Sequence, residues 1–264
     1  MTDAAYRRPP IVCSTGGFWT FPLERSLDII SQAGFDTIEL MVTHDPATQS
    51  AEVAGRLANN AGLRIQSVHA PMLVLTRRVW GPGFQSIIER SVPLAKSLGA
   101  EVVVLHPPYL FEVKYQTWLL GHLRSFSRDH GVAIAVENMF RMWVKGRPVR
   151  GHRWVTPFDL HRFDDLTLDT SHCGVDDVDI LEALERTGRQ IAHIHLSDNY
   201  GEHKDSHAPP GEGRLPLRQF LKNLPSSGAR GALSLEIDMR ALAQDPPKAV
   251  DTLKRAREFC EDAL

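Results

Sequence analysis

The stretch IAHIHLSD, residues 191–198, ends an apolar run on a histidine, His195, and sets the pattern for the rest of the chain. Five further stretches place an imidazole or a carboxylate directly after a short apolar run: SVHAP (67–71), VVVLHPP (102–108), IAVEN (134–138), LTLDTSH (166–172) and LSLEID (233–238). A seventh stretch, KDSH (204–207), carries two more such side chains in a predicted loop. When repeated parallel strands finish on residues of this kind, a parallel barrel gathers them at one rim.

Strand-like runs alternate with amphipathic helical segments along the whole chain. The predicted strands are 11–14, 36–41, 64–69, 101–106, 132–137, 166–169, 191–196 and 232–237. Strands that are apolar on both faces are typical of a parallel sheet covered by helices. Glycines such as Gly34 and Gly99 end helical segments before the next strand, as helix C-caps do. The sequence therefore predicts a single α/β domain over residues 1–264, a (β/α)8 TIM barrel.

Composition and charge give no general attraction to nucleic acid or membranes, although local basic patches remain possible. The chain has 264 residues, 42% of them hydrophobic, and a formal net charge of −2. This charge gives no global attraction to nucleic acid or to an anionic membrane, and no apolar run approaches the length of a membrane span. The three cysteines, Cys13, Cys173 and Cys260, lie far apart, so we expect reduced thiols in a cytoplasmic protein.

Nine side chains near the predicted rim are candidate metal ligands. They are His69, His106, Glu137, Asp169, His172, His195, Asp205, His207 and Glu236. The four that end predicted strands five to eight would bring like charges and unpaired polar groups together without a cation. For the other five, hydrogen bonding to a ligand or contact with substrate is the alternative. Imidazole and carboxylate ligands suit Zn²⁺, Mn²⁺, Co²⁺ or Fe²⁺, and the set is large enough for one to three ions.

Two long segments, after predicted strands three and five, would lie on the same rim as the ligands. The first contains Arg77, and the second, residues 138–157, contains Arg141, Trp143 and Lys145. One interpretation is a pair of solvated basic loops. The other is a positive rim that attracts a phosphate or carboxylate group of the substrate, with these four residues in contact with it. Basic residues with interleaved aromatics also fit nucleic acid, for which two loops are weaker support.

Other polar residues near the rim receive structural interpretations. Glu39, at the end of predicted strand two, is expected in salt bridges or rim hydrogen bonds, and membership of the metal site is the alternative. His193 shares the face of His195 and is expected to pack inside the barrel. Cys173 is interpreted as a small residue rather than a nucleophile or ligand. The turn PPGEGRLP (209–216) is either a simple glycine turn or a lip of the active site.

In this order and spacing, the motifs resemble the xylose isomerase-like barrel superfamily, which includes sugar-phosphate isomerases and epimerases and the endonuclease IV type of apurinic-site nuclease. The resemblance runs from GFDTIEL (34–40) through the stretches quoted above to LEID (235–238). Its ketose 3-epimerase branch implies metal ligation by Glu137, Asp169, His195 and Glu236. That branch also implies acid and base roles for the two glutamates and a substrate contact by His172. The endonuclease branch implies a three-zinc set made of all nine candidate ligands.

Departures from the endonuclease pattern favour the epimerase branch. NMFRMWVKGR (138–147) replaces the glycine-rich stretch of endonuclease IV, and the residues after His69 lack its DNA-entering tyrosine. The ending HAPPGEGRLP (207–216) is more typical of the isomerase and epimerase group.

The expected function is a divalent-metal isomerase or epimerase of a small sugar or sugar phosphate, with proton transfer by Glu137 and Glu236. The alternatives are a polynuclear zinc phosphoesterase, acting on a small phosphate ester or abasic DNA, and a noncatalytic metabolite-binding protein. A homodimer is expected only by analogy with the resembling enzymes.

Overall fold

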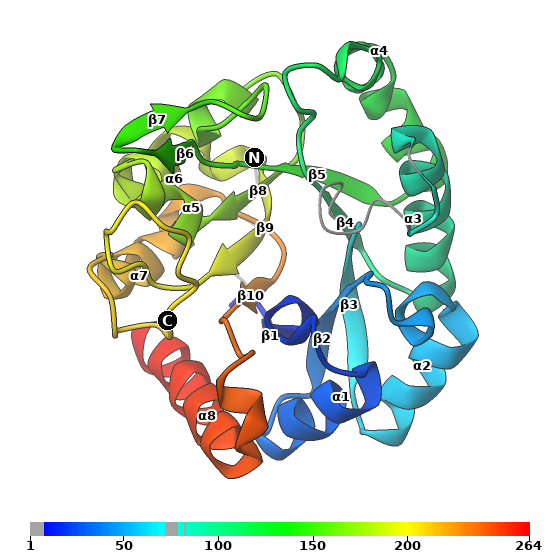
Figure 1. The fold of residues 1–264 in the computed structure, drawn as a ribbon, viewed down its shortest axis with the longest axis vertical. Coiled ribbons are helices and arrows are strands. Elements are labelled where there is room, and N and C mark those ends of the chain that lie inside the picture. Colours follow the sequence, from blue (N-terminus) through cyan, green and yellow to red (C-terminus); the bar gives the residue numbers. More distant parts are fainter. Residues whose placement is uncertain (1–7, 72–78, 82) are drawn as a thin grey trace.

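The apolar, β-branched runs form eight parallel strands that close into a barrel in a computed structural model, which describes residues 8–71, 79–81 and 83–264 (Figure 1). The barrel strands are β1 (Ile11–Ser14), β2 (Thr37–Met41), β3 (Arg64–His69), β4 (Val102–Leu105), β5 (Ala133–Glu137), β8 (Leu166–Asp169), β9 (Ile191–Leu196) and β10 (Leu233–Leu235). Around the barrel their order is β1, β10, β9, β8, β5, β4, β3 and β2. The predicted (β/α)8 barrel is confirmed.

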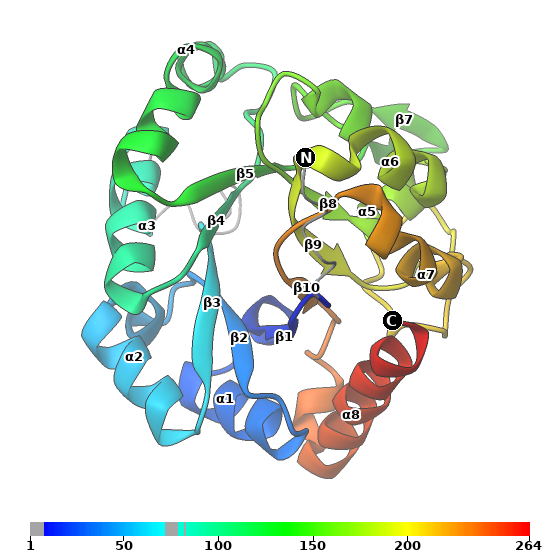
Figure 2. The ribbon, with the colours of Figure 1, turned by 180° about the vertical axis from the view of Figure 1, so that it is seen from behind.

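Helices surround the barrel on its outside, as both views along its axis show (Figures 1 and 2). The α-helices of the described residues are α1 (Leu23–Gln32), α2 (Ala51–Asn60), α3 (Phe84–Leu98), α4 (Val113–His130), α5 (Thr170–Val175), α6 (Ile180–Thr187), α7 (Leu217–Ser227) and α8 (Pro246–Ala263). Gly99 and Gly131 follow α3 and α4 with φ of 70° and 66°, a left-handed cap that glycine adopts without strain. None of the helices in this part of the chain combines the length and apolarity that a bilayer crossing requires.

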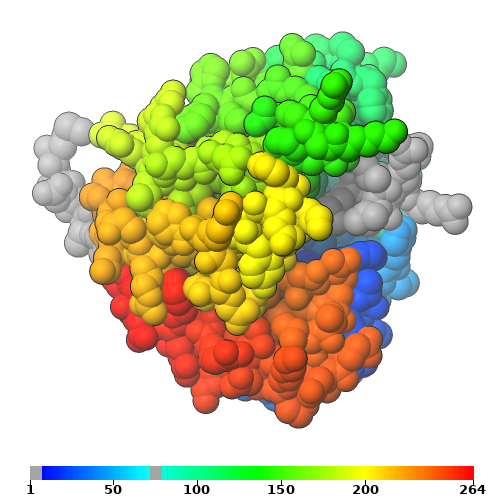
Figure 3. Space-filling view, turned by 60° about the vertical axis from the view of Figure 1, so that its left-hand side comes forward, coloured from blue at the N-terminus to red at the C-terminus, as the bar shows by residue number. Residues whose placement is uncertain are grey.

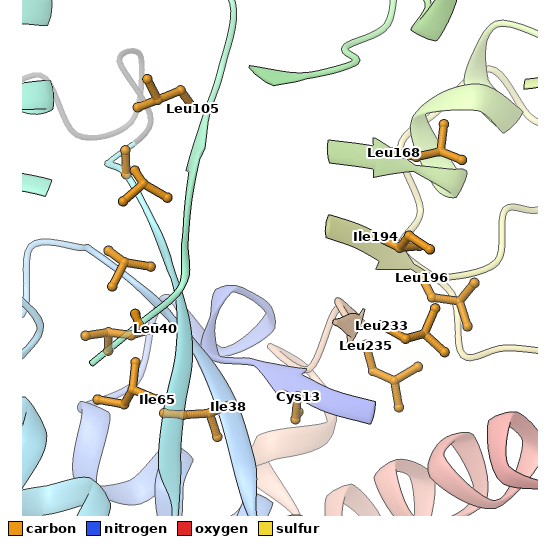
Figure 4. Close-up of a cluster of buried hydrophobic side chains, with 14 of the residues drawn as sticks. Cys13, Ile38, Leu40, Ile65, Leu105, Leu168, Ile194, Leu196, Leu233 and Leu235 are labelled. Atoms are coloured by element: carbon orange, nitrogen blue, oxygen red, sulfur yellow. The ribbon is translucent and has the colours of Figure 1, made fainter. Parts of the chain in front are cut away.

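The hydrophobic core lies between the barrel and the helices. Alternate strand residues such as Ile38, Leu168, Ile194 and Leu235 point outward and are at most 2% exposed (Figure 4). On the helix side, α1 buries Leu23, Leu27 and Ile30, the face that its sequence pattern predicts. Because each strand alternates, the residues between these core positions must point into the barrel.

The interior of the barrel is chemically divided. One side, from β4, β5 and β9, is filled by small apolar residues: Val102, Val104, Ala133, Ala135 and Ala192. The rest of the interior, which we call the polar side, comprises β1 to β3, β10 and the carboxyl-terminal parts of β8 and β9. There, Glu39 of β2 is the register partner of both Ser14 of β1 and Ser67 of β3. Thr167 of β8 pairs with His193 of β9. The polar side therefore continues from the mouth of the barrel into its interior.

The connection between β5 and β8 differs from the expected irregular loop, because it contains an antiparallel hairpin. Strands β6 (Met142–Val144) and β7 (Arg147–Val149) pair across the turn Lys145–Gly146, whose residues have φ of 50° and 73°. Two consecutive positive φ values match the tight turns that join twisted strands. No sequence pattern predicted this hairpin, because its strands are only three residues long and largely exposed.

Candidate metal centre

Each of four adjacent strands brings one side chain from its carboxyl end to a common point at the mouth of the barrel. Glu137 and Asp169 end β5 and β8, His195 lies in β9, and Glu236 directly follows β10. One ligand atom from each residue lies within 4.8 Å of those of the others. The Nδ1 atom of His195 is 3.0 Å from Glu137 Oε1, 2.9 Å from Glu236 Oε2 and 3.7 Å from Asp169 Oδ2. All four residues are at most 8% exposed.

The buried carboxylates at this point are suited to bind a cation. Glu137 Oε2 and Asp169 Oδ2 are buried and receive no hydrogen bond from the described residues. Burial raises the pKa of Asp169 to about 6, since the favourable effect of His172 only partly offsets it. Burial also acts to raise the pKa of Glu137, but the His195 and His106 imidazoles outweigh it and hold that pKa well below its usual range. A cluster of buried carboxylates with unpaired oxygens is stabilised by a metal ion.

A second group lies beside the first, toward β3 and β4. The Nε2 atoms of His69 and His106 are 3.4 and 3.1 Å from Glu137 Oε2. His69 Nδ1 lies 2.7 Å from the carbonyl oxygen of Ala70, so this nitrogen carries a proton, and in the neutral ring Nε2 is the nitrogen that would bind an ion. His69, Glu137 and His195 therefore form a second candidate set around one ion.

A third group lies on the opposite side of the mouth. Asp169, His172 and His207 have ligand atoms within 4.8 Å of one another. Asp205 Oδ2 lies between the two imidazoles, 3.3 Å from His172 Nε2 and 2.8 Å from His207 Nε2. His207 has a φ of 38°, an unfavourable value for a residue with a side chain. The structure thus brings all nine predicted ligands into one continuous cluster; their roles as ligands remain predictions.

Asn138, the residue after the ligand on β5, aligns the neighbouring strand. Its side-chain Oδ1 accepts a hydrogen bond from the Asp169 backbone N–H at 2.8 Å, and its Nδ2 donates to the Asp169 carbonyl oxygen at 3.1 Å. Its own carbonyl oxygen lies 2.8 Å from His172 Nδ1. Asp169 Oδ1 in turn accepts from the His172 backbone N–H at 2.8 Å, which caps α5. Sequence reasoning gave Asn138 no role, although its position next to Glu137 was a usable signal.

A cavity of about 270 Å³ opens onto the cluster. Besides candidate ligands, its lining includes Gly16, Gly17, Trp19, Met139, Phe140 and Arg240. A Cβ atom on Gly16 would lie 2.7 Å from Glu236 Oε1, and one on Gly17 would lie 1.9 Å from the carbonyl oxygen of Ile237. The glycine pair after β1 therefore gives the cavity floor its shape. These contacts depend on the loop after β1, which sequence patterns did not define.

Three residues of the β5–β8 connection that were predicted to contact substrate lie away from the cavity. Arg141 Nε is 3.1 Å from Asp176 Oδ1, Trp143 stacks on His203 with ring centroids 3.8 Å apart, and Lys145 occupies the exposed hairpin turn. None of these three lines the cavity. Arg77 lies outside the described residues. Figure 3 shows the green β5–β8 connection beside the yellow loop around residue 200, in agreement with the Trp143 contact.

Among the described residues that line the cavity, Arg240 is the arginine. Its Nε atom is 2.8 Å from Asp238 Oδ1, and its guanidinium lies 5.7 Å from the centre of the Trp19 ring. Sequence reasoning missed Arg240, since it follows the strand β10 by several residues and nothing in its pattern distinguishes it from a surface arginine.

The turn at 209–216 does not line the cavity. The Asp198 carboxylate anchors it, with Oδ2 accepting from the Gly211 N–H at 3.0 Å and Oδ1 accepting from the Leu215 N–H at 3.0 Å. A Cβ atom on Gly213 would lie 2.2 Å from Asp198 Oδ1. The geometry therefore favours the simple glycine turn over the lip of an active site.

The fold and the site define a TIM barrel with an imidazole and carboxylate cluster at the carboxyl ends of its strands. The family model described as "Xylose isomerase-like TIM barrel" matches residues 27–261, and the chain belongs to this family. An uncharacterized protein of Mycobacterium tuberculosis is 30% identical over 244 residues, which cover 85% of this chain and 87% of that protein.

Two solved structures extend the comparison. A D-tagatose 3-epimerase-like protein is similar with a TM-score of 0.72 and 23% identity, over 96% of this chain and 98% of the other. A family 2 AP endonuclease from Brucella melitensis is similar with a TM-score of 0.67 and 17% identity, over 87% of this chain and 93% of the other. At these identities the two likenesses concern the fold, and the same fold serves both chemistries.

Proposed function

We propose that this protein is a divalent-metal-dependent isomerase or epimerase that acts on a small sugar or a sugar phosphate. The observation that carries the proposal is the convergence of Glu137 and Glu236 on one imidazole nitrogen, His195 Nδ1, at 3.0 and 2.9 Å. Both glutamates line a cavity of about 270 Å³, a volume suited to one small molecule. The likeness to a D-tagatose 3-epimerase-like fold supports the same reaction class.

Glu137, Asp169, His195 and Glu236 are the residues that would hold the principal ion. A divalent cation bound there supplies Lewis acidity, which makes the C–H bond beside a sugar carbonyl more acidic. Zn²⁺, Mn²⁺ and Co²⁺ all suit this mixed nitrogen and oxygen ligand set.

Glu137 and Glu236 are positioned to move a proton between two faces of a substrate. They come from β5 and β10, which β8 and β9 separate around the barrel, so their carboxylates approach the cavity from different directions. One glutamate removes the proton from carbon and the other returns a proton to it, and epimerisation requires the return to occur on the opposite face. Met139, Phe140 and Trp19 supply apolar surface on the cavity wall, which helps to exclude water.

His172 is the proposed substrate contact of the site. Its ring is 5% exposed, lines the cavity and lies 4.8 Å from the Phe140 ring. Asp205 fixes its Nε2 side and the Asn138 carbonyl faces its Nδ1 side. Because the Asn138 carbonyl oxygen accepts from Nδ1 and fixes the ring orientation, Nε2 is the nitrogen that would contact a substrate hydroxyl, in exchange for its contact with Asp205.

A polynuclear zinc phosphoesterase is the second candidate, because the cluster offers more ligands than one ion requires. Three ligand groups surround the mouth, centred on Glu137, Asp169 and their histidines. Ions held in two or three of them would suit the clamping of phosphoryl oxygens. The substrate would be a small phosphate ester or an abasic site in DNA.

Two parallel assays test the choice between these reactions. The protein, loaded with Mn²⁺, Co²⁺ or Zn²⁺, is incubated in D₂O with a panel of ketoses, and NMR follows deuterium at the carbon beside the carbonyl. The same preparations are incubated with a panel of phosphate esters, and released phosphate is measured. Deuterium in a sugar supports the proposal, whereas phosphate release without deuterium in any sugar supports the phosphoesterase. A Glu236→Gln variant controls for contaminating activities, because it should lose whichever reaction belongs to this site.

A further inference from the structure

A buried carboxylate lies one layer beneath the metal centre, at Glu39 of β2. The residue is 0% exposed and lies inside the barrel, away from the cavity lining. Its Oε1 atom is 3.0 Å from His195 Nε2, while its Oε2 atom is 2.7 Å from His193 Nε2. Glu39 therefore lies on the side of the His195 ring that faces away from Glu137 and Glu236.

Glu39 is held in this place by residues from other strands. Ser67 of β3 donates from Oγ to Oε2 at 3.1 Å, and Ser234 of β10 donates from Oγ to Oε1 at 3.4 Å. With the two histidines of β9, three strands besides its own contact the carboxylate. A carboxylate with this many partners cannot turn toward the mouth without leaving buried donors unpaired.

The two ring nitrogens of His195 consequently face different partners. Nδ1 faces the carboxylates of the cluster, and Nε2 faces Glu39. A neutral imidazole carries one proton, and the nitrogen that binds a metal must be the one without it. A carboxylate facing the other nitrogen accepts its proton, fixes the tautomer and makes the ring a better ligand.

We infer that Glu39 is a positioning residue that holds the proton of His195 on Nε2, so that Nδ1 is the atom offered to the metal ion. The inference rests on the proposed metal centre and adds to it a residue that does not touch the cavity. It also gives the polar side of the barrel interior a purpose: Ser67, Ser234 and His193 keep Glu39 aimed at His195. In the alternative arrangement, an ion lies deeper in the barrel, between Glu39, His193 and His195. The ligand atom of His195 would then be Nε2 and not Nδ1.

Nitrogen NMR of the protein with isotope-labelled histidine separates the two arrangements. Spectra are recorded on the metal-free protein and after addition of Zn²⁺ alone, and the His195 signals are assigned by their loss in a His195→Asn variant. We expect Zn²⁺ to shift the Nδ1 signal while Nε2 keeps its proton. Metal on Nε2 overturns the inference. If the wild-type protein takes up no Zn²⁺ at all, the proposed metal centre fails first, and the two failures are therefore distinguishable.

A Glu39→Gln variant tests the same inference through affinity, since the amide has nearly the same shape and no charge. We expect Zn²⁺ binding, measured by chelator competition, to weaken about 10- to 100-fold with an unchanged number of ions per chain. Glu182→Gln, the same chemical change on the exposed surface of α6, is the matched control and should bind Zn²⁺ as tightly as the wild type. Affinity equal to the wild type in Glu39→Gln, or the loss of one whole ion, contradicts the inference. Should Glu39→Gln fail to fold, the wild-type spectra still decide.

Discussion

The strand-end cluster and the β5–β8 connection (residues 138–165) both carry charged side chains near the mouth of the barrel. The cluster gathers its charged side chains at the cavity, whereas the connection contributes the apolar side chains Met139 and Phe140 to the cavity lining. Six of the predicted side chains come from the strand ends and lie in one cluster, which His172, Asp205 and His207 complete. In the connection, Arg141 pairs with Asp176, and Arg150 pairs with Asp159. Barrel closure fixes the direction of a strand-end side chain, whereas a loop follows its own turns and local ion pairs. Position on a strand therefore predicted the convergence of side chains better than charge in a loop did.

The largest difference between the two regions should appear on loss of a carboxylate. Glu137→Gln or Glu236→Gln should lower kcat about 10²- to 10⁴-fold, because each removes a proton-transfer group. Glu137→Gln should also lose bound metal, since His69, His106 and His195 surround this carboxylate. Steady-state kinetics and elemental analysis measure both effects. Lys145→Ala, in the hairpin turn, is the control and should change neither; a Glu137→Gln enzyme within tenfold of the wild type would contradict the proposed site.

Removal of the metal should destabilise the barrel, and this effect should depend on the ligand cluster and not on the β5–β8 connection. An ion present at about 1,000 times its dissociation constant stabilises the folded state by about 4 kcal/mol. Chelation should therefore lower the melting temperature of the wild type, and added Mn²⁺ or Zn²⁺ should restore it. Calorimetry measures the shift. In Glu137→Gln the chelator should have much less effect, and an equal shift in both proteins would place the stabilising ion somewhere else.

Arg141→Ala should affect stability and leave chemistry almost unchanged. The change leaves the buried Asp176 carboxylate without its guanidinium partner, at a cost of about 2 kcal/mol in the free energy of unfolding. Since Arg141 does not line the cavity, kcat/KM should stay within about threefold of the wild type. Urea denaturation and kinetics on the same preparation separate the two effects. A large rise in KM with normal stability would restore Arg141 as a substrate contact.

A matched pair of glycine variants compares the two regions directly. Gly16→Ala places a Cβ atom 2.7 Å from Glu236 Oε1, and the displacement of this carboxylate should lower kcat about tenfold. Gly146→Ala, in the hairpin turn, meets no atom within 4 Å but has a φ of 73°, so it should cost about 1 kcal/mol of stability and no activity. Equal activity in the two variants would show that Gly16 does not control the position of Glu236.

The smallest effect is expected at Asp159, in the short 3-10 helix Pro157–Leu160 of the connection. Burial acts to raise its pKa, but the backbone N–H groups of Val155 and Thr156 and the Arg150 guanidinium lower it below the usual 3.8. A lowered pKa in the folded state means that the carboxylate stabilises the protein above about pH 3.8, and that this contribution disappears as the pH falls through the folded value.

Asp159→Asn should therefore lower the free energy of unfolding by about 1 kcal/mol or less at neutral pH, because the group is partly exposed. The difference between variant and wild type should shrink as the pH falls below about 3.8. Urea titrations at several pH values measure it, and a difference that does not change with pH would contradict the electrostatic cause.

Much of the fold and the ligand cluster could be predicted, because both follow from periodic patterns. A strand such as β9 has two faces, so His195 must share the interior with His193 once Ile194 packs outside. The closed sheet then gathers strand ends from all parts of the chain. Strand limits were less certain: β4 ends at Leu105 and β10 at Leu235, one and two residues before the predicted ends.

The remaining features depend on contacts between segments that have no pattern of their own. Asn138 acts through the backbone of Asp169, and Arg240 reaches the cavity through the chain after β10. For Glu39, the sequence predicted a salt bridge or a hydrogen bond but not the partners, which are His193 and His195 of β9. Substrate contacts were predicted in the basic connection from its charge and its interleaved aromatic residues, a pattern that does not reveal the acidic partners of Arg141 and Arg150.

Gly17 has a consequence for how this protein could be altered by directed evolution. Its missing side chain allows the segment after β1 to lie against Ile237, and the Met239 N–H donates to the Gly17 carbonyl oxygen at 3.0 Å. The first and last strands of the barrel are joined at this seam, beside Glu236. In a library of all single substitutions, position 17 should accept almost no replacement, whereas Trp19 and Phe140 on the cavity wall should be the positions where new substrate preferences arise. Efforts to redesign selectivity are best concentrated on those walls, with the seam left as it is.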